Sequence, residues 1–312
     1  MEKIDPRVDV VFKKIFGVEE NKDLLISLIN SIVSQEDQVS EVTLLNPYNP
    51  KNFRKDKLSI LDIKAQSQEG KRFNIEIQIS DEADYDKRAL YYWAKLYTEQ
   101  LQVSQDYSLL SKAIGIHILS FTSIPEVKKY HNVFHLTEKE TGFSYFKDLE
   151  LHTIELKKFS GDKREEVNDL VAKIRNSLDI WVAFLTRQDL LNREKLPEPL
   201  DTPALKKALN VLDIMNFSPE EREAYEEHLK WLRIEANTLK KYEAKGFAEG
   251  KAEGRAEGEA KGEAKGIEKG VEKGKKERDI EIARTMLAKG MDVETISAVT
   301  GLSSDDVKAL SS

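Results

Sequence analysis

A strict alternation between residues 73 and 80 constrains the fold more than any other feature of the chain. Apolar residues alternate there with polar ones, Phe73, Ile75, Ile77 and Ile79 against Asn74, Glu76, Gln78 and Ser80. A period of two is that of a β-strand, whose successive side chains point to opposite faces of a sheet. The pattern predicts a strand with one face in a core and with Glu76 and Gln78 together on the other face.

Residues 57–66 predict the partner strand, in which Asp62 stands between two apolar residues. A carboxylate inside an apolar strand is costly unless it is paired or bound to a metal ion. A two-residue turn at 69–70 would send Asp62 to the wrong face, whereas a three-residue loop at 68–70 sets it directly across from Glu76. Gly70 supplies the left-handed residue that such a loop needs at its third position. We therefore predict a hairpin in which the Cβ atoms of Asp62 and Glu76 lie about 5 Å apart.

Two carboxylates at that distance repel each other unless a cation or a proton lies between them. Their oxygens are ligands that suit Mg²⁺ or Mn²⁺. Such a cation can activate water and stabilise the charge that develops on a phosphate. A second interpretation is a solvated polar strand with an ordinary charge cluster. The position of Asp62 inside LSILDI leaves the two interpretations evenly matched.

The first 160 residues mix helical and strand periodicity. Helical spacing at 9–33 and 85–103 encloses predicted strands at 42–45, 57–66 and 72–80, and further strands are predicted at 113–121, 132–136 and 149–156. This order predicts an α/β domain over residues 1–160 with a mixed sheet. Residues 161–245 show helical spacing only and predict a helical region.

Residues 246–278 form a Gly/Glu/Lys/Ala repeat, with glycine at every fourth position from 246 to 274. Each glycine costs a helix about 1 kcal/mol relative to alanine. The repeat is therefore either a helix that packs closely against another copy or a flexible charged spacer, and the second alternative is slightly favoured.

Residues 279–312 predict a small helical module with helices at 280–288, 293–300 and 305–310, the last capped by Ser304. The spacing around GLSS is that of a helix-turn-helix. The last helix offers only Lys308 beside Asp305 and Asp306, a charge balance that favours a packing or docking module over a DNA-reading one.

Composition limits the possible functions. The chain has 312 residues, a net charge of −7, no cysteine and five scattered histidines. The missing cysteines exclude disulfides, zinc fingers and thiol catalysis. Any DNA binding has to come from a local basic patch helped by divalent cations. Since no apolar run resembles a signal peptide or a membrane span, we expect a soluble, cytoplasmic protein with no membrane partner.

Five segments in order resemble the Rpn family of recombination-promoting nucleases and transposase-like proteins, within the PD-(D/E)XK nuclease superfamily. They are DVVFKKIF, LLISLINSIV, LDIKA, IEIQI and DKRALYYWAKLY. The resemblance extends to about residue 159, and the glycine repeat with its terminal GLSS module is also typical of relatives. It implies an α/β, restriction-endonuclease-like core with a mixed sheet flanked by helices, followed by an all-helical C-terminal region.

The resemblance also implies roles for particular residues. Asp62 and Glu76 take the two acidic positions of the motif and would hold the metal, while Gln78 takes the position that is lysine in the superfamily pattern. Glutamine carries no positive charge but can orient water. From its face and spacing we infer that Lys64 supplies the missing charge. Arg88, in RALYYW, is placed to reach a DNA phosphate, although pairing with an aspartate one turn earlier is an equal alternative.

Together these features predict a divalent-metal-dependent endodeoxyribonuclease in DNA recombination or mobile-element biology. Its cofactor is expected to be Mg²⁺, with Mn²⁺ or Ca²⁺ as alternatives, and its partners are DNA and further copies of itself, bound through the C-terminal helical region. The predicted site comprises Asp62, Glu76, Gln78 and Lys64, with Arg88 and Lys64 on the nucleic acid. The alternative is a catalytically impaired nuclease fold that serves as a scaffold or DNA-binding protein and assembles through its helical tail.

Overall fold

The computed structural model describes residues 4–48, 62–81, 84–160 and 164–310. Its strands are β1 (Val42–Leu44), β2 (Asp62–Ser67), β3 (Arg72–Gln78), β4 (Ala113–Leu119), β5 (His131–Thr137) and β6 (Ser144–Glu155). They form one sheet in the order β1-β2-β3-β4-β6-β5. Strand β4 runs parallel to both β3 and β6, and the other neighbours are antiparallel. The predicted mixed sheet is confirmed, while the predicted strand residues 57–61 lie outside the described residues.

The helices precede, interrupt and follow this sheet. They are α1 (Asp9–Phe16), α2 (Lys22–Ile32), α3 (Tyr85–Thr98), α4 (Leu156–Phe159), α5 (Val167–Val171), α6 (Ser177–Arg187), α7 (Pro203–Asp213), α8 (Pro219–Ala288), α9 (Val293–Thr300) and α10 (Ser304–Ala309). Everything described after β6 is helix or connection, so the all-helical C-terminal region is confirmed as well. No helix in the described part of the chain is both long and apolar enough to cross a membrane.

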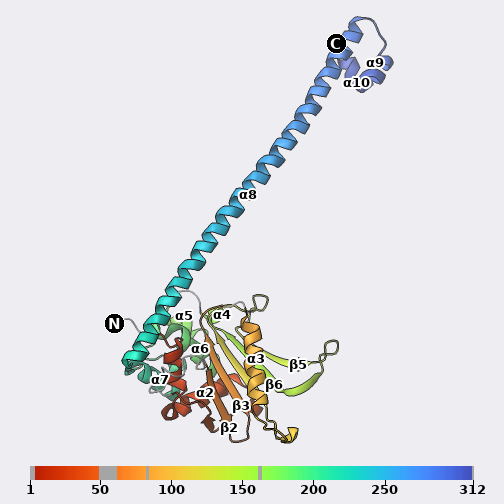
Figure 1. Cartoon of the computed structure of the whole chain (residues 1–312). Helices are drawn as coiled ribbons and strands as arrows, with labels where there is room; N and C mark the ends of the chain where they lie inside the picture. The colour runs from red at the N-terminus through yellow and green to blue at the C-terminus, as the bar shows by residue number, and fades with distance from the viewer. Residues whose placement is uncertain (1–3, 49–61, 82–83, 161–163, 311–312) are drawn as a thin grey trace. The chain divides into compact units, whose positions relative to one another are not determined.

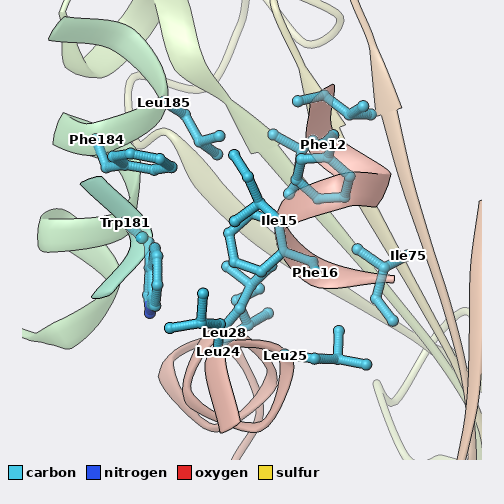
Figure 2. Packing of buried hydrophobic residues seen from close by; sticks show 14 of the residues in the cluster. Phe12, Ile15, Phe16, Leu24, Leu25, Leu28, Ile75, Trp181, Phe184 and Leu185 are labelled. Atoms are coloured by element: carbon cyan, nitrogen blue, oxygen red, sulfur yellow. The ribbon is translucent and has the colours of Figure 1, made fainter. Parts of the chain in front are cut away.

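One face of the sheet forms the main hydrophobic core. The apolar set of β3, with Ile75 at its centre, packs there with side chains of α1, α2 and α6, among them Phe16 and Trp181 (Figure 2). The rings of Phe16 and Trp181 meet edge to face with their centroids 5.3 Å apart. Burial of apolar surface is the main force that drives folding. Residues of α6 and α7 belong to the same core as those of the sheet. The domain limits at residues 160 and 245 stay predictions.

Helix α3 covers the opposite face of the sheet (Figure 1). A small apolar cluster joins the two, formed by Tyr85 and Ala89 of the helix with Leu119 and Phe121 at the end of β4. The polar residues of β3 lie on this covered face, where Asn74 is 1% exposed and Glu76 is 0% exposed. The interpretation of β3 as a solvated polar strand is therefore wrong, because α3 shields that face.

The chain divides into two compact units, Met1–Leu232 and Arg233–Ser312, with α8 running from one into the other. The glycine repeat forms helix throughout, and its residues are exposed. The flexible spacer that the sequence slightly favoured is thus replaced by a continuous helix. In the second unit α9 and α10 pack on the end of α8 through Ala283, Ile296 and Val307. Ser303, one residue before the predicted cap, accepts the capping hydrogen bond of α10.

Candidate active site

The hairpin of β2 and β3 has the predicted register. Asp62 pairs directly with Glu76. The backbone N–H of Ser67 donates to the carbonyl oxygen of Lys71, so residues 68–70 form the three-residue loop. Gly70 has a φ of +87°, and a Cβ there would lie 2.7 Å from Ser111 Oγ, so both backbone conformation and space call for glycine. Because directly opposed residues of an antiparallel pair share a face, the positions of Asp62 and Glu76 lie on the face that α3 covers. The side chain of Asp62 is outside the described residues.

Glu76 lies between two groups that come from different elements. Its Oε1 is 3.6 Å from Nη2 of Arg88 on α3, and its Oε2 is 3.7 Å from Nδ1 of His117 on β4. Both distances exceed those of direct hydrogen bonds and are those of close electrostatic neighbours. A fully buried carboxylate is stable only with such compensation. The sequence-predicted residues Glu76 and Arg88 are thus brought together, while the aspartate that was the alternative partner of Arg88 pairs with Lys87 at 3.0 Å.

His117 and Tyr85 are part of this cluster and were missed in the sequence. Burial first, and then the electrostatic influence of Arg88 and His152, together lower the pKa of His117 to about 4. The ring is therefore neutral at pH 7, with Nδ1 only 2.7 Å from the hydroxyl oxygen of Tyr85. A signal was present, since a histidine inside the apolar run AIGIHILSF is as conspicuous as Asp62 inside LSILDI.

Lys64 and Gln78 lie on the same face but on either side of Glu76. Gln78 is the last residue of β3 and is 9% exposed. Lys64 pairs with Asn74, so the two residues are separated by about 13 Å along the strand direction, at about 3.3 Å per residue. The ammonium of Lys64 lies 3.5 Å from Oε2 of Glu99, just beyond the end of α3. Gln78 is therefore two residues from Glu76 on the same face of β3. Lys64 lies two positions away in the opposite direction, and its side chain reaches the C-terminal end of α3.

Comparison with family models decides the identity of this fold. Residues 6–242, more than half of the chain, match the PD-(D/E)XK nuclease family transposase model. The chain belongs to the PD-(D/E)XK nuclease family. Residues 276–312 match the C-terminal HTH domain of the Rpn/YhgA-like nuclease family, which covers the end of α8 with α9 and α10. Both matches confirm the resemblance to the Rpn family. Neither the curated proteins nor the solved structures gave a match.

The donor chemistry of this PD-(D/E)XK site fits a divalent cation. Nucleases of this family generally use divalent metals, and a hard cation takes carboxylate and amide oxygens as ligands. Glu76 and Gln78 present such oxygens on one face, and the register adds the position of Asp62. Among the side chains that the structure describes, no group of three or more histidine and acidic residues is arranged as a metal site. A cation would therefore depend on Asp62 together with Glu76.

Proposed function

We propose that this PD-(D/E)XK chain is a divalent-metal-dependent endodeoxyribonuclease, with Mg²⁺ as its first candidate cation, acting in DNA recombination or in the biology of mobile elements. The observation that carries the proposal is the pairing of Asp62 with a fully buried Glu76 beside Arg88. A strand carboxylate at 0% exposure is expensive, and a structural role alone does not require a second acidic residue directly opposite.

Each residue has a distinct task in this proposal. Asp62 and Glu76 hold the cation, which when bound supplies an acidified water and stabilises negative charge on the phosphate. Gln78 carries no positive charge that could polarise the attacking water, but its side-chain amide can orient that water by hydrogen bonding. Arg88 holds the phosphate next to Glu76, and Lys64 adds positive charge on the same face at a greater distance.

Nicking of supercoiled plasmid by the full chain tests the function. We expect cleavage with Mg²⁺ or Mn²⁺, none with a chelator, and none with Asp62→Ala under the same conditions. Asp86→Ala is the matched control, since Asp86 is an exposed acidic residue on α3 and its loss should leave cleavage unchanged. Cleavage that persists in Asp62→Ala would show a contaminating nuclease or a different site.

A catalytically impaired scaffold or DNA-binding protein is the second candidate, and the glutamine at position 78 favours it. Loss of the superfamily lysine removes a charge that could polarise water or phosphate. A wild-type chain that binds DNA in the presence of divalent cations but leaves plasmid intact would support this candidate. Recovery of cleavage in Gln78→Lys would then assign the impairment to that residue.

We further propose that the chain forms a homo-oligomer through α8. A Cβ added at any glycine of the repeat would meet nothing within 4 Å, so the fold of one chain gives no reason for these glycines. The charge order also inverts along the repeat, with Lys251 and Arg255 leading early repeats and Glu259 and Glu263 leading later ones. An antiparallel second copy would set unlike charges side by side, and the glycines would let the two backbones approach closely.

A further inference from the structure

Tyr85 contacts both of the groups that flank the Glu76 carboxylate. Its hydroxyl oxygen lies 2.7 Å from His117 Nδ1, and its ring lies under the Arg88 guanidinium, whose Cζ is 5.3 Å from the ring centroid. The rings of Tyr85 and His117 also meet edge to face at 5.8 Å. Tyr85 is buried at the start of α3, and so one aromatic residue joins the helix to both neighbours of Glu76.

Strand β4 itself leaves room for the side chain of His117. Gly115 stands two residues earlier on the same face of β4, and a Cβ there would come within 3.1 Å of His117 Nε2 and within 2.7 Å of a Leu151 methyl group. A larger residue at position 115 would have to displace the Leu151 side chain and would press on the imidazole ring. The ring is thus held by Tyr85 on one side and by close packing on the other.

The position of the imidazole proton follows from its surroundings. His117 Nε2 has no hydrogen-bond partner among the residues that the structure describes. A buried N–H without a partner costs about 1–3 kcal/mol, so a proton on Nε2 is disfavoured. A proton on Nδ1 is instead donated to the Tyr85 hydroxyl oxygen at 2.7 Å. It also lies near the Glu76 carboxylate, whose Oε2 is 3.7 Å from the same nitrogen, and that negative charge favours the proton on Nδ1.

We propose that Tyr85 and His117 are positioning residues for the Glu76 carboxylate: the Nδ1–H of His117 is donated to the Tyr85 hydroxyl oxygen, and this hydrogen bond fixes the ring with Nδ1 facing Oε2 of Glu76 at 3.7 Å. The inference rests on the proposed nuclease function insofar as Glu76 is taken to hold the cation. The inference goes beyond that function because it gives a positioning role to two residues that contact neither the cation nor DNA. Groups that orient a metal-binding carboxylate typically change metal affinity or activity 10–100-fold when they are replaced.

Matched substitutions of His117 separate positioning from simple filling of space. Asparagine places its amide N–H where Nδ1 lies, whereas the longer glutamine places it near Nε2. We expect His117→Asn to keep Mn²⁺ affinity close to wild type and His117→Gln to weaken it about 10–100-fold, with kcat of plasmid nicking falling in parallel. Tyr85→Phe, which keeps the ring and removes the hydroxyl, should fall between the two. His135→Asn, on the exposed strand β5, is the control that should bind Mn²⁺ like wild type.

The measurements are calorimetric Mn²⁺ titration of the full-length variants and ¹⁵N NMR of histidine-labelled wild type, which reports the tautomer of His117 without any substitution. We expect the Nδ1–H tautomer, with a resonance that shifts in Glu76→Gln. An Nε2–H tautomer, or equal Mn²⁺ affinities in His117→Asn and His117→Gln, would overturn the inference. A wild type that cleaves no DNA but shows the Nδ1–H tautomer and its dependence on Glu76 would overturn the proposed function and leave the positioning of the carboxylate standing.

Discussion

Strand β3 and the repeat of helix α8 both contain residues that are energetically unfavourable where they stand. In β3 a carboxylate is fully buried, and in α8 a glycine recurs every fourth residue through exposed helix. Glu76 is explained by its neighbours, since Arg88 and His117 approach its two oxygens. The glycines of the repeat have no such neighbours: a Cβ added at any of them would have no atom within 4 Å in the single chain.

This difference between buried Glu76 and the exposed glycines indicates different causes for the two unfavourable features. A costly residue inside a fold can be accounted for by contacts within the chain, and those contacts point to the chemistry of the site. A costly residue on an exposed helix has no internal account, so its cause lies in a partner or in the mechanics of the helix itself. Substitutions in one region or the other should therefore have separate effects, on cleavage and folding stability in β3 and on assembly in α8.

The largest effect is expected at Glu76. Glu76→Gln keeps the shape of the side chain but removes the charge that a cation needs, so cleavage should fall by about 10²–10³, the loss typical when one preorganised electrostatic group is removed from an active site. The melting temperature without metal should change little, because the free energy gained near Arg88 and His117 is offset by the cost of burying the charge, and both are removed together. Plasmid nicking and thermal melting measure the two. A sharp drop in melting temperature would instead give Glu76 a structural role.

Ile75, the neighbouring residue on the opposite face, is the matched contrast. It is fully buried in the main core, so Ile75→Ala should lower the free energy of unfolding by about 2–5 kcal/mol. Cleavage per folded molecule should stay near wild type, since the change lies across the strand from the site. Urea denaturation with activity measured below the transition tests this. Equal loss of activity in both variants would show that the two faces of β3 do not act separately.

Arg88→Ala should weaken DNA binding about tenfold, the value of one lost charge-assisted contact. Lys87→Ala is the control and should bind DNA like wild type. The Lys87 side chain is 84% exposed and forms an ion pair with Asp84, not with Glu76. Fluorescence anisotropy of a labelled duplex with Ca²⁺ in place of Mg²⁺ measures affinity. Binding that is unchanged in Arg88→Ala and independent of divalent cations would transfer the DNA contact to the C-terminal HTH domain.

These residues also show how far the sequence could predict the site. The period of β3 and the glycine at position 70 are local, and they were enough to predict the pairing of Asp62 with Glu76. The burial of Glu76 depends on α3, and its approach to His117 depends on the parallel pairing of β3 with β4, whose residues are about 40 positions apart. Neither is encoded in a local period. Lys64 was assigned to the correct face, but its contact with Glu99 required the position at which α3 ends.

Stability should fall with pH in the window set by His117. Its pKa is about 4 in the fold and near 6.5 when unfolded, so between these values the unfolded chain binds more protons and folding weakens as pH falls. The slope per such site approaches about 1.4 kcal/mol for each pH unit. His117→Asn should therefore flatten the decline between pH 6.5 and 4. Some slope should remain, because burial and then His152 also lower the pKa of His131 to about 4. Denaturation at several pH values tests this, and an unchanged slope would contradict a buried neutral His117.

The smallest effect per residue is expected in α8, where it separates two explanations of the glycines. Alanine at 254, 258 and 262 should strengthen an isolated helix by about 1 kcal/mol per site, since nothing in the chain lies near the added methyl groups. If a second copy packs along the glycine row, the same methyl groups keep the two backbones apart. We expect the second result: a lower mass per particle by light scattering together with undiminished helicity by circular dichroism. Serine at 252, 256 and 260 adds one atom at neighbouring positions outside the glycine row and should leave the mass unchanged. A triple alanine variant that keeps the wild-type mass and melts at a higher temperature would show that the repeat is a single exposed helix and would remove α8 as the site of assembly.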